Sequence, residues 1–88
     1  MMTTSAELQR RLAEMERAEG EATLTQVCAV VGIGLRAVQS RERTAATARA
    51  RATVAWVLCD RLGWRQARAA AALGRTVRQV KAMLRAVR

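Results

Sequence analysis

Four residues near the end of the chain restrict what it can fold into. Gln66, Ala70, Gly74 and Val80 are separated by three, three and five residues. A small residue at Ala70 lets two helices cross closely, and Gly74 supplies the positive φ that a tight turn between helices demands. Val80 then faces back into the core. This spacing is typical of a DNA-binding helix-turn-helix, although an ordinary antiparallel helix pair that ends at a glycine shares part of it.

The remaining sequence also favours helices. Alanine, leucine and arginine are good helix formers, the 88 residues include no proline, and no segment alternates like a strand. We therefore predict an all-α fold, a small multi-helix domain with a C-terminal helix-turn-helix. From caps and glycines the expected helices are 5–19 ending at Gly20, a second from Thr23 or Thr25 to Gly32, 35–39, 45–62, 65–73, and 76–87 capped by Thr76.

Apolar residues at helical spacing mark the inner stripes of two of these helices. They are Val54, Val57, Leu58 and Leu62 in helix 45–62, and Val77, Val80, Leu84 and Val87 in helix 76–87.

The two cysteines have packing roles in this interpretation. Cys28 and Cys59 stand at mostly apolar helical positions, which indicates buried thiols in a reducing cytoplasm. Two isolated thiols in a chain without histidine cannot form a zinc site, so we expect neither a metal nor another cofactor.

Charge is distributed unevenly along the chain. Residues 1–22 carry a balance of −2, whereas residues 23–88 carry thirteen Arg or Lys against Glu42 and Asp60, a balance of +11. A body this basic favours nucleic acid as a partner. We expect an acidic amphipathic helix within 1–22, followed by a DNA-binding domain over 23–88.

The first helix carries an apolar stripe of its own, formed by Leu8, Leu12 and Met15. Three roles stay open for it: packing on the body, dimerisation with a second copy, or docking of RNA polymerase or a second regulator. No segment matches a membrane span or a signal peptide, so we expect a cytoplasmic, nucleoid-associated protein with no membrane partner.

Residue types that reach bases and phosphates gather in and before helix 76–87. For base readout in the major groove we expect Arg75, Thr76, Arg78, Gln79 and Ala82. For the DNA backbone or the minor groove we expect Arg41, Arg43, Arg49, Arg51, Arg65, Arg68, Lys81 and Arg85. The first set would select the sequence, and the second would set affinity and register.

About three quarters of the chain resembles the C-terminal DNA-binding domain, domain IV, of the DnaA replication initiators. Residues 24–33 resemble that family's opening helix, residues 40–43 its basic loop, and residues 54–58 its long helix. Residues 74–75 and Val80 match the two ends of its G-R-D-H-T-T-V signature. The resemblance implies a fold like DnaA domain IV or the Trp repressor, and sequence-specific binding of double-stranded DNA.

Departures from the family limit what the resemblance implies. Residues 76–79 read T-V-R-Q where the family has D-H-T-T, the positions that carry much of its base readout. Arg49 and Arg51 also stand about one residue out of register. The chain has no phosphate-binding loop, so it lacks the ATPase of an initiator. Stand-alone domains of this kind resemble transcription regulators of phage or phage-derived gene-transfer genes, with a different recognition sequence.

Other functions compete with this one. The first is an adaptor that recruits RNA polymerase or another factor and binds DNA mainly without sequence preference. RNA binding is a second, but Trp56 and Trp64 are the only aromatic residues, and we expect both in the core rather than stacked on bases. The chain offers no histidine, no phosphate loop and no paired carboxylates, so we do not expect an enzyme.

Overall fold

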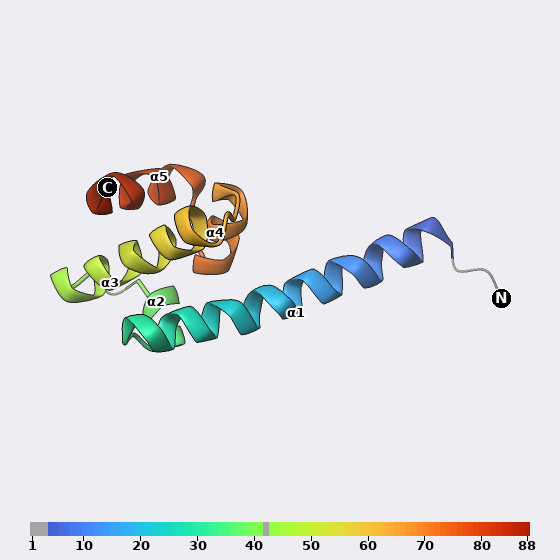
Figure 1. Cartoon of the computed structure of the whole chain (residues 1–88), viewed down its shortest axis with the longest axis horizontal. Coiled ribbons are helices and arrows are strands. Elements are labelled where there is room, and N and C mark those ends of the chain that lie inside the picture. The colour runs from blue at the N-terminus through green and yellow to red at the C-terminus, as the bar shows by residue number, and fades with distance from the viewer. Residues whose placement is uncertain (1–3, 42) are drawn as a thin grey trace.

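The computed structural model describes residues 4–41 and 43–88, and over these residues it is all-helical, as predicted. The elements are α1 (Ser5–Val31), α2 (Leu35–Gln39), α3 (Ala45–Trp56), the π-helical turn η1 (Val57–Arg61), α4 (Gln66–Leu73) and α5 (Val77–Val87). The second half of α1 packs with the other helices into a small body, and the first half projects away from it (Figure 1). The molecule measures 54 × 23 × 22 Å. Among the described helices, none has the length and apolarity needed to cross a bilayer.

Threonine caps begin three of the helices. The hydroxyls of Thr4, Thr44 and Thr76 each accept a hydrogen bond of 3.1–3.2 Å from the amide three residues further on. Such caps satisfy amides that a helix leaves without partners at its N-terminus. The predicted starts at Ser5 and after Thr76 are thereby confirmed.

Helix α1 is continuous, so the predicted end at Gly20 and the new start at Thr23 or Thr25 are wrong. A glycine inside a helix costs about 1 kcal/mol relative to alanine, which is less than tertiary packing can supply. Gly20 lies against α4 and the residues before it, with Trp64 and Arg68 as neighbours. The glycine therefore marks a close contact between α1 and the body instead of a break.

Helix α3 and η1 together occupy the predicted helix 45–62. Val54 and Leu58 are fully buried as predicted, whereas Val57 is only half-buried and Leu62 is 49% exposed. A π-turn adds a residue per hydrogen-bonded ring, so the residues within and after it leave the stripe that a 3.6-residue period defines. The predicted burial is wrong for Leu62 and holds only in part for Val57.

Helices α4 and α5 form the predicted pair at the C-terminal end. Gly74 ends α4 in the left-handed conformation, with φ 65° and ψ 36°, as its spacing predicts. Ala70 and Val80 are both buried in the core. Val77 and Val87 each remain 37% exposed, so their predicted burial is wrong. The stripe of α5 contacts the body through its middle turns and extends beyond that contact at both ends.

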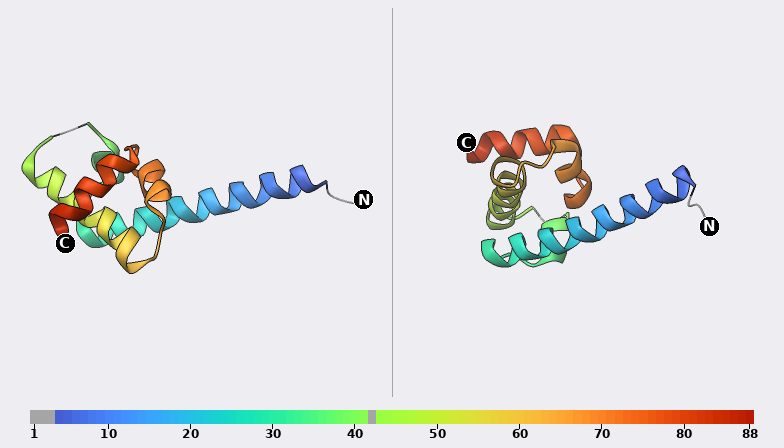
Figure 2. Two further views of the ribbon diagram at one scale, coloured as in Figure 1. Left: turned by 90° about the horizontal axis from the view of Figure 1, so that it is seen from above. Right: turned by 45° about the vertical axis from the view of Figure 1, so that its right-hand side comes forward.

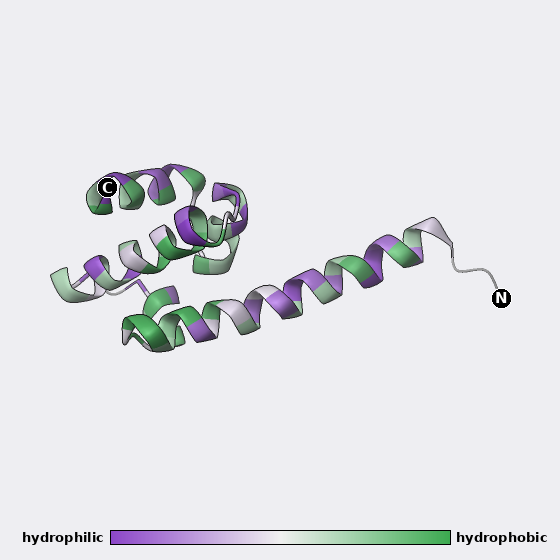
Figure 3. Cartoon of the chain, in the orientation of Figure 1, coloured by the Kyte–Doolittle hydropathy of each residue, from purple (hydrophilic) through white to green (hydrophobic). Residues whose placement is uncertain are grey.

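The core lies where α1, α3, α4 and α5 meet. Its fully buried large side chains are Leu24, Cys28, Val38, Val54, Leu58, Leu73, Val80 and Leu84. Figure 2 shows that α3, α4, α5 and the second half of α1 form the body, and that the first half of α1 lies outside it. On that projecting half, hydrophobic patches alternate with hydrophilic ones (Figure 3). Its apolar stripe therefore packs on no described part of the same chain.

Candidate nucleic-acid interface

A capping box fixes the first turn of α5. The Thr76 hydroxyl accepts a hydrogen bond from the Gln79 amide at 3.1 Å, and Gln79 Oε1 accepts one from the Thr76 amide at 2.9 Å. Both side chains are exposed, and the box satisfies two amides at the helix start. A bidentate contact from Gln79 to adenine would use the same Oε1 atom a second time, while the side-chain NH₂ group remains available as a donor.

Arg75 joins the turn before α5 to the loop before α3. Its Nη2 atom donates a hydrogen bond to the Ser40 carbonyl oxygen, and its Nη1 atom donates to the Gly74 carbonyl oxygen at 3.2 Å. The side chain is half-buried. The sequence predicts a base contact for Arg75, and that contact would compete with these two hydrogen bonds. Its observed position is that of a link between two loops.

Arg51 is buried, so the prediction that it contacts the DNA backbone is wrong. Only 6% of it is exposed. Its Nε atom donates to the Val38 carbonyl at 2.9 Å, and its Nη2 atom donates to those of Ser40 at 3.0 Å and Ala37 at 3.4 Å. The last carbonyls of a helix lack partners, and its C-terminal end favours a cation. Arg51 therefore holds the end of α2 against α3.

An open hollow of ≈ 520 Å³ lies between the loop before α3 and the first turns of α5. Its lining residues come from both segments and from the α4–α5 turn: Arg41, Arg43, Arg51, Gly74, Arg75, Gln79, Ala82 and Met83. Arg41 and Arg43, predicted to contact the DNA backbone, thus lie beside Gln79 and Ala82, predicted to read bases. Met83 was not predicted here, although its position four residues after Gln79 on the same helix indicates a shared side.

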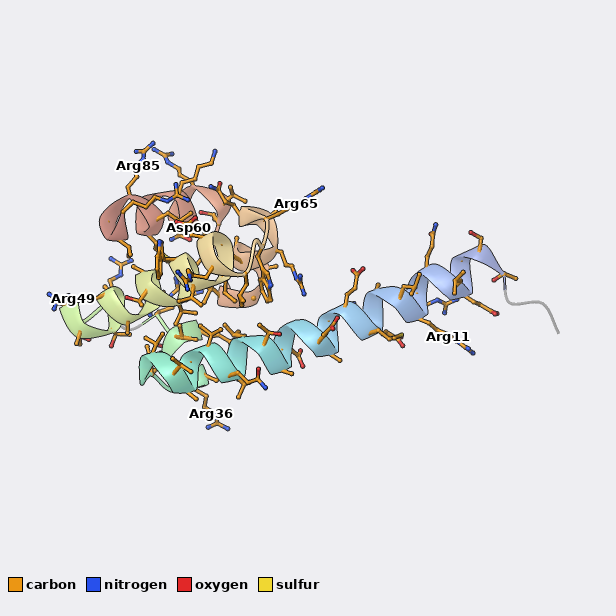
Figure 4. The ribbon with its side chains drawn as sticks, in the orientation of Figure 1. Arg11, Arg36, Arg49, Asp60, Arg65 and Arg85 are labelled. Carbon is orange, nitrogen blue, oxygen red and sulfur yellow. The ribbon has the colours of Figure 1, made fainter. Side chains whose placement is uncertain are left out.

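The other predicted contacts spread over the rest of the surface. Arg49, Arg65 and Arg85 point outward from α3, the start of α4 and α5 at separate places on the body (Figure 4). Arg78 is exposed on α5, and Lys81 and Arg85 line a smaller hollow beside Gln66. The predicted residues thus form one cluster at the start of α5 and a wider set of exposed cations around it.

Arg68 faces a different side of the molecule. Its guanidinium carbon lies 3.9 Å from the centroid of the Trp64 ring, a cation–π distance. Both residues line an apolar hollow with Gly20 of α1 and lie apart from the arginines at the start of α5. Arg68, predicted to contact the DNA backbone, thus lies away from the other predicted residues at the start of α5.

Acidic side chains are scarce on the body. Among the described residues that follow Glu21, Asp60 is the one acid, and Arg88 binds it through two hydrogen bonds of 2.6 and 2.9 Å. These hydrogen bonds hold the pKa of Asp60 below its usual value. Glu42 lies outside the described residues. The described surface around the start of α5 is therefore cationic, as a partner with phosphate groups requires.

The two cysteines occupy packing positions. Burial raises the pKa of both thiols, and the charge of Asp60 raises that of Cys59 further. Both sulfurs thus remain protonated at neutral pH, as small apolar groups in or against the core.

No family model, curated protein or solved structure matches this chain. The function proposed next rests on its own residues and their arrangement.

Proposed function

We propose that the chain is a sequence-specific double-stranded DNA-binding protein that acts as a transcription regulator. In this proposal α4, the Gly74 turn and α5 serve as a helix-turn-helix, and α5 lies in the major groove with its first turns at the bases. The observation that carries the proposal is the hollow at the start of α5, where Arg41 and Arg43 lie beside Gln79 and Ala82.

The exposed side of α5 suits a major groove. Arg78, Ala82 and Arg85 follow one another at spacings of four and three residues, so they share one side of the helix, and all three are exposed. Ala82 is short enough to let the helix approach base edges closely, and its methyl group fits beside a thymine methyl. Arginine at position 78 has the fork of donors that matches guanine.

The surrounding arginines would hold the phosphates on either side. Arg41 and Arg43 come from the loop before α3, and Arg49 and Arg65 extend from other parts of the body. In this role they add affinity that depends on salt and not on sequence. Arg75 keeps the loop with Arg41 and Arg43 next to α5 through its hydrogen bond to Ser40. We thus revise its proposed role from reading a base to placing the phosphate contacts.

The test is selection of binding sites from a random duplex library at physiological salt. We expect an enriched DNA motif. Duplex RNA of the same sequence should not displace that DNA from the protein. Ala82→Glu places a carboxylate on the proposed reading face and should abolish the enrichment. Ala13→Glu makes the same change at an exposed helical position of α1 and should leave it intact. Binding to every duplex without enrichment would contradict sequence-specific recognition and favour the adaptor.

A further inference from the structure

The projecting half of α1 exposes large apolar side chains in a line. Leu8 is 52% exposed, Leu12 49% and Met15 66%. Their spacings of four and three residues match a seam at which one helix contacts another. A stripe of this kind on a helix that leaves the body needs a partner to cover it.

The seam faces away from the side of α1 that packs into the body. At 100° per residue, its three residues lie within about 60° of one another. The core residues Leu24, Val27 and Cys28 belong to a side of the helix that is rotated by roughly 145° from the seam. The seam is therefore no continuation of the contact with the body, and a second helix could lie along it without meeting the body.

Opposite charges flank the seam. Arg11 lies on one side of it and Glu16 on the other, each about 70° from its centre. When two copies pair in parallel around a two-fold axis, the side that carries Arg11 faces the side that carries Glu16 of the second copy. The two-fold axis generates this attraction between Arg11 and Glu16 twice, once on each side of the pair. An antiparallel pair would instead place the two Arg11 sides against each other.

We infer that this half of α1 binds a second copy of the same chain as a short parallel coiled coil. Leu8, Leu12 and Met15 form its apolar layers, and two attractions between Arg11 and Glu16 fix the direction. The next seam position is Glu19, where the two copies would bring like charges together. The pairing ends there, and the two bodies diverge from that point. The inference does not depend on DNA binding, because it concerns a surface that the DNA proposal does not use.

The test is to measure the molar mass of the full chain in solution, without DNA, by analytical ultracentrifugation over a wide range of protein concentrations. We expect a monomer–dimer equilibrium that Leu12→Asp abolishes while circular dichroism shows the body still folded. Glu19→Leu should tighten the dimer by removing the like charges and adding an apolar layer. Neither substitution lies in the core, so a change in dimerisation cannot be attributed to unfolding of the body.

A charge exchange tests the direction of pairing. Arg11→Glu should weaken the dimer about tenfold, because two attractions become two repulsions. Arg10→Glu makes the same change on the opposite side of the helix and should have no such effect. Combining Arg11→Glu with Glu16→Arg should restore the affinity. A chain that stays monomeric, a dimer that survives Leu12→Asp, or a charge exchange that fails to restore affinity would overturn the inference.

Discussion

The Nε atom of Arg51 donates a hydrogen bond of 2.9 Å to the carbonyl oxygen of Val38, which joins the middle of α3 to the end of α2. The same guanidinium reaches the carbonyl of Ser40, which also accepts a hydrogen bond from Arg75. Two arginines, one from α3 and one from the turn between α4 and α5, thus meet at one carbonyl. Through it, the loop with Arg41 and Arg43 is placed next to α5.

Removing the buried arginine should destabilise the fold. Arg51→Ala removes the buried guanidinium that donates hydrogen bonds to carbonyls at the end of α2, and we expect the free energy of unfolding to fall by about 3 kcal/mol. Arg49→Ala, two residues away and exposed, should change it by less than about 0.5 kcal/mol. Urea unfolding followed by circular dichroism measures both. Equal effects of the two variants would contradict the structural role of Arg51.

Replacing Gly20 with alanine should stabilise the fold. A β-carbon there would lie 3.5 Å from Arg68 Nη2 and 3.6 Å from Trp64 Cη2, which are ordinary contacts. Because alanine is the better helix former, Gly20→Ala should raise the free energy of unfolding by about 0.5–1 kcal/mol. Thermal melts measure the change. A destabilised variant would show that α1 needs a closer approach to the body than these distances indicate.

Gly74 should respond in the opposite direction. Its φ of 65° is one that side chains rarely adopt, and beyond the two neighbouring residues in the chain no atom lies within 4 Å of an added β-carbon. Gly74→Ala should therefore cost about 1 kcal/mol through backbone conformation alone. The same thermal melts measure it. A neutral result would mean that the turn between α4 and α5 adjusts without affecting the rest of the body.

The sequence predicts those parts of the fold that depend on neighbours along the chain. The threonine caps and Gly74 act within a few residues, and the helix ends beside them, the starts of α1 and α5 and the end of α4, are where the sequence places them. Gly20 could not be interpreted this way, because its place inside α1 depends on contact with Trp64 and Arg68. Leu62 was misplaced because a local pattern does not show that a π-turn shifts the phase of the helix.

The candidate site follows the same division. Gln79 and Ala82 are exposed on α5 as predicted, since the apolar period of one helix determines which sides remain exposed. Arg49 and Arg51 look alike in the sequence, yet one is exposed and the other buried. Two residues along a helix correspond to a rotation of about 200°, so the two point to nearly opposite sides. Tertiary packing determines which side of α3 faces α2, and a local sequence pattern cannot predict it.

Acid should weaken the link between Asp60 and Arg88. Hydrogen bonds from Arg88 lower the pKa of Asp60 from its ordinary value of 3.8. A carboxyl whose pKa is lower in the folded state stabilises the fold above its unfolded pKa and loses that effect as pH falls through its folded pKa. Asp60→Asn should therefore lower the melting temperature slightly at neutral pH and no longer at strongly acidic pH. A difference that is constant across this range would contradict the assignment.

Gln79 allows stability and DNA binding to be separated. Glutamate also serves in a capping box and suits the N-terminal end of a helix. Gln79→Glu should therefore leave the unfolding free energy unchanged within about 0.5 kcal/mol, while its charge at the proposed DNA surface lowers affinity at least tenfold. Fluorescence anisotropy with the selected duplex measures the affinity. Gln9→Glu, the same change on the projecting half of α1, is the control; equal losses in both would contradict a reading surface at Gln79.

Arg43 and Gln79 should affect DNA binding in different ways. Arg43→Ala should weaken binding to every sequence alike and reduce the salt dependence by about one unit of slope, because one phosphate contact is lost. Gln79→Ala should narrow the gap between matched and mismatched duplexes, because a base contact is lost. Arg36→Ala removes the same charge from α2, on the side of the body opposite Arg85 (Figure 4). It should leave the slope unchanged. If Arg43→Ala and Arg36→Ala act equally, the arginines at the hollow contribute only net charge, and the proposed division between phosphate and base contacts fails.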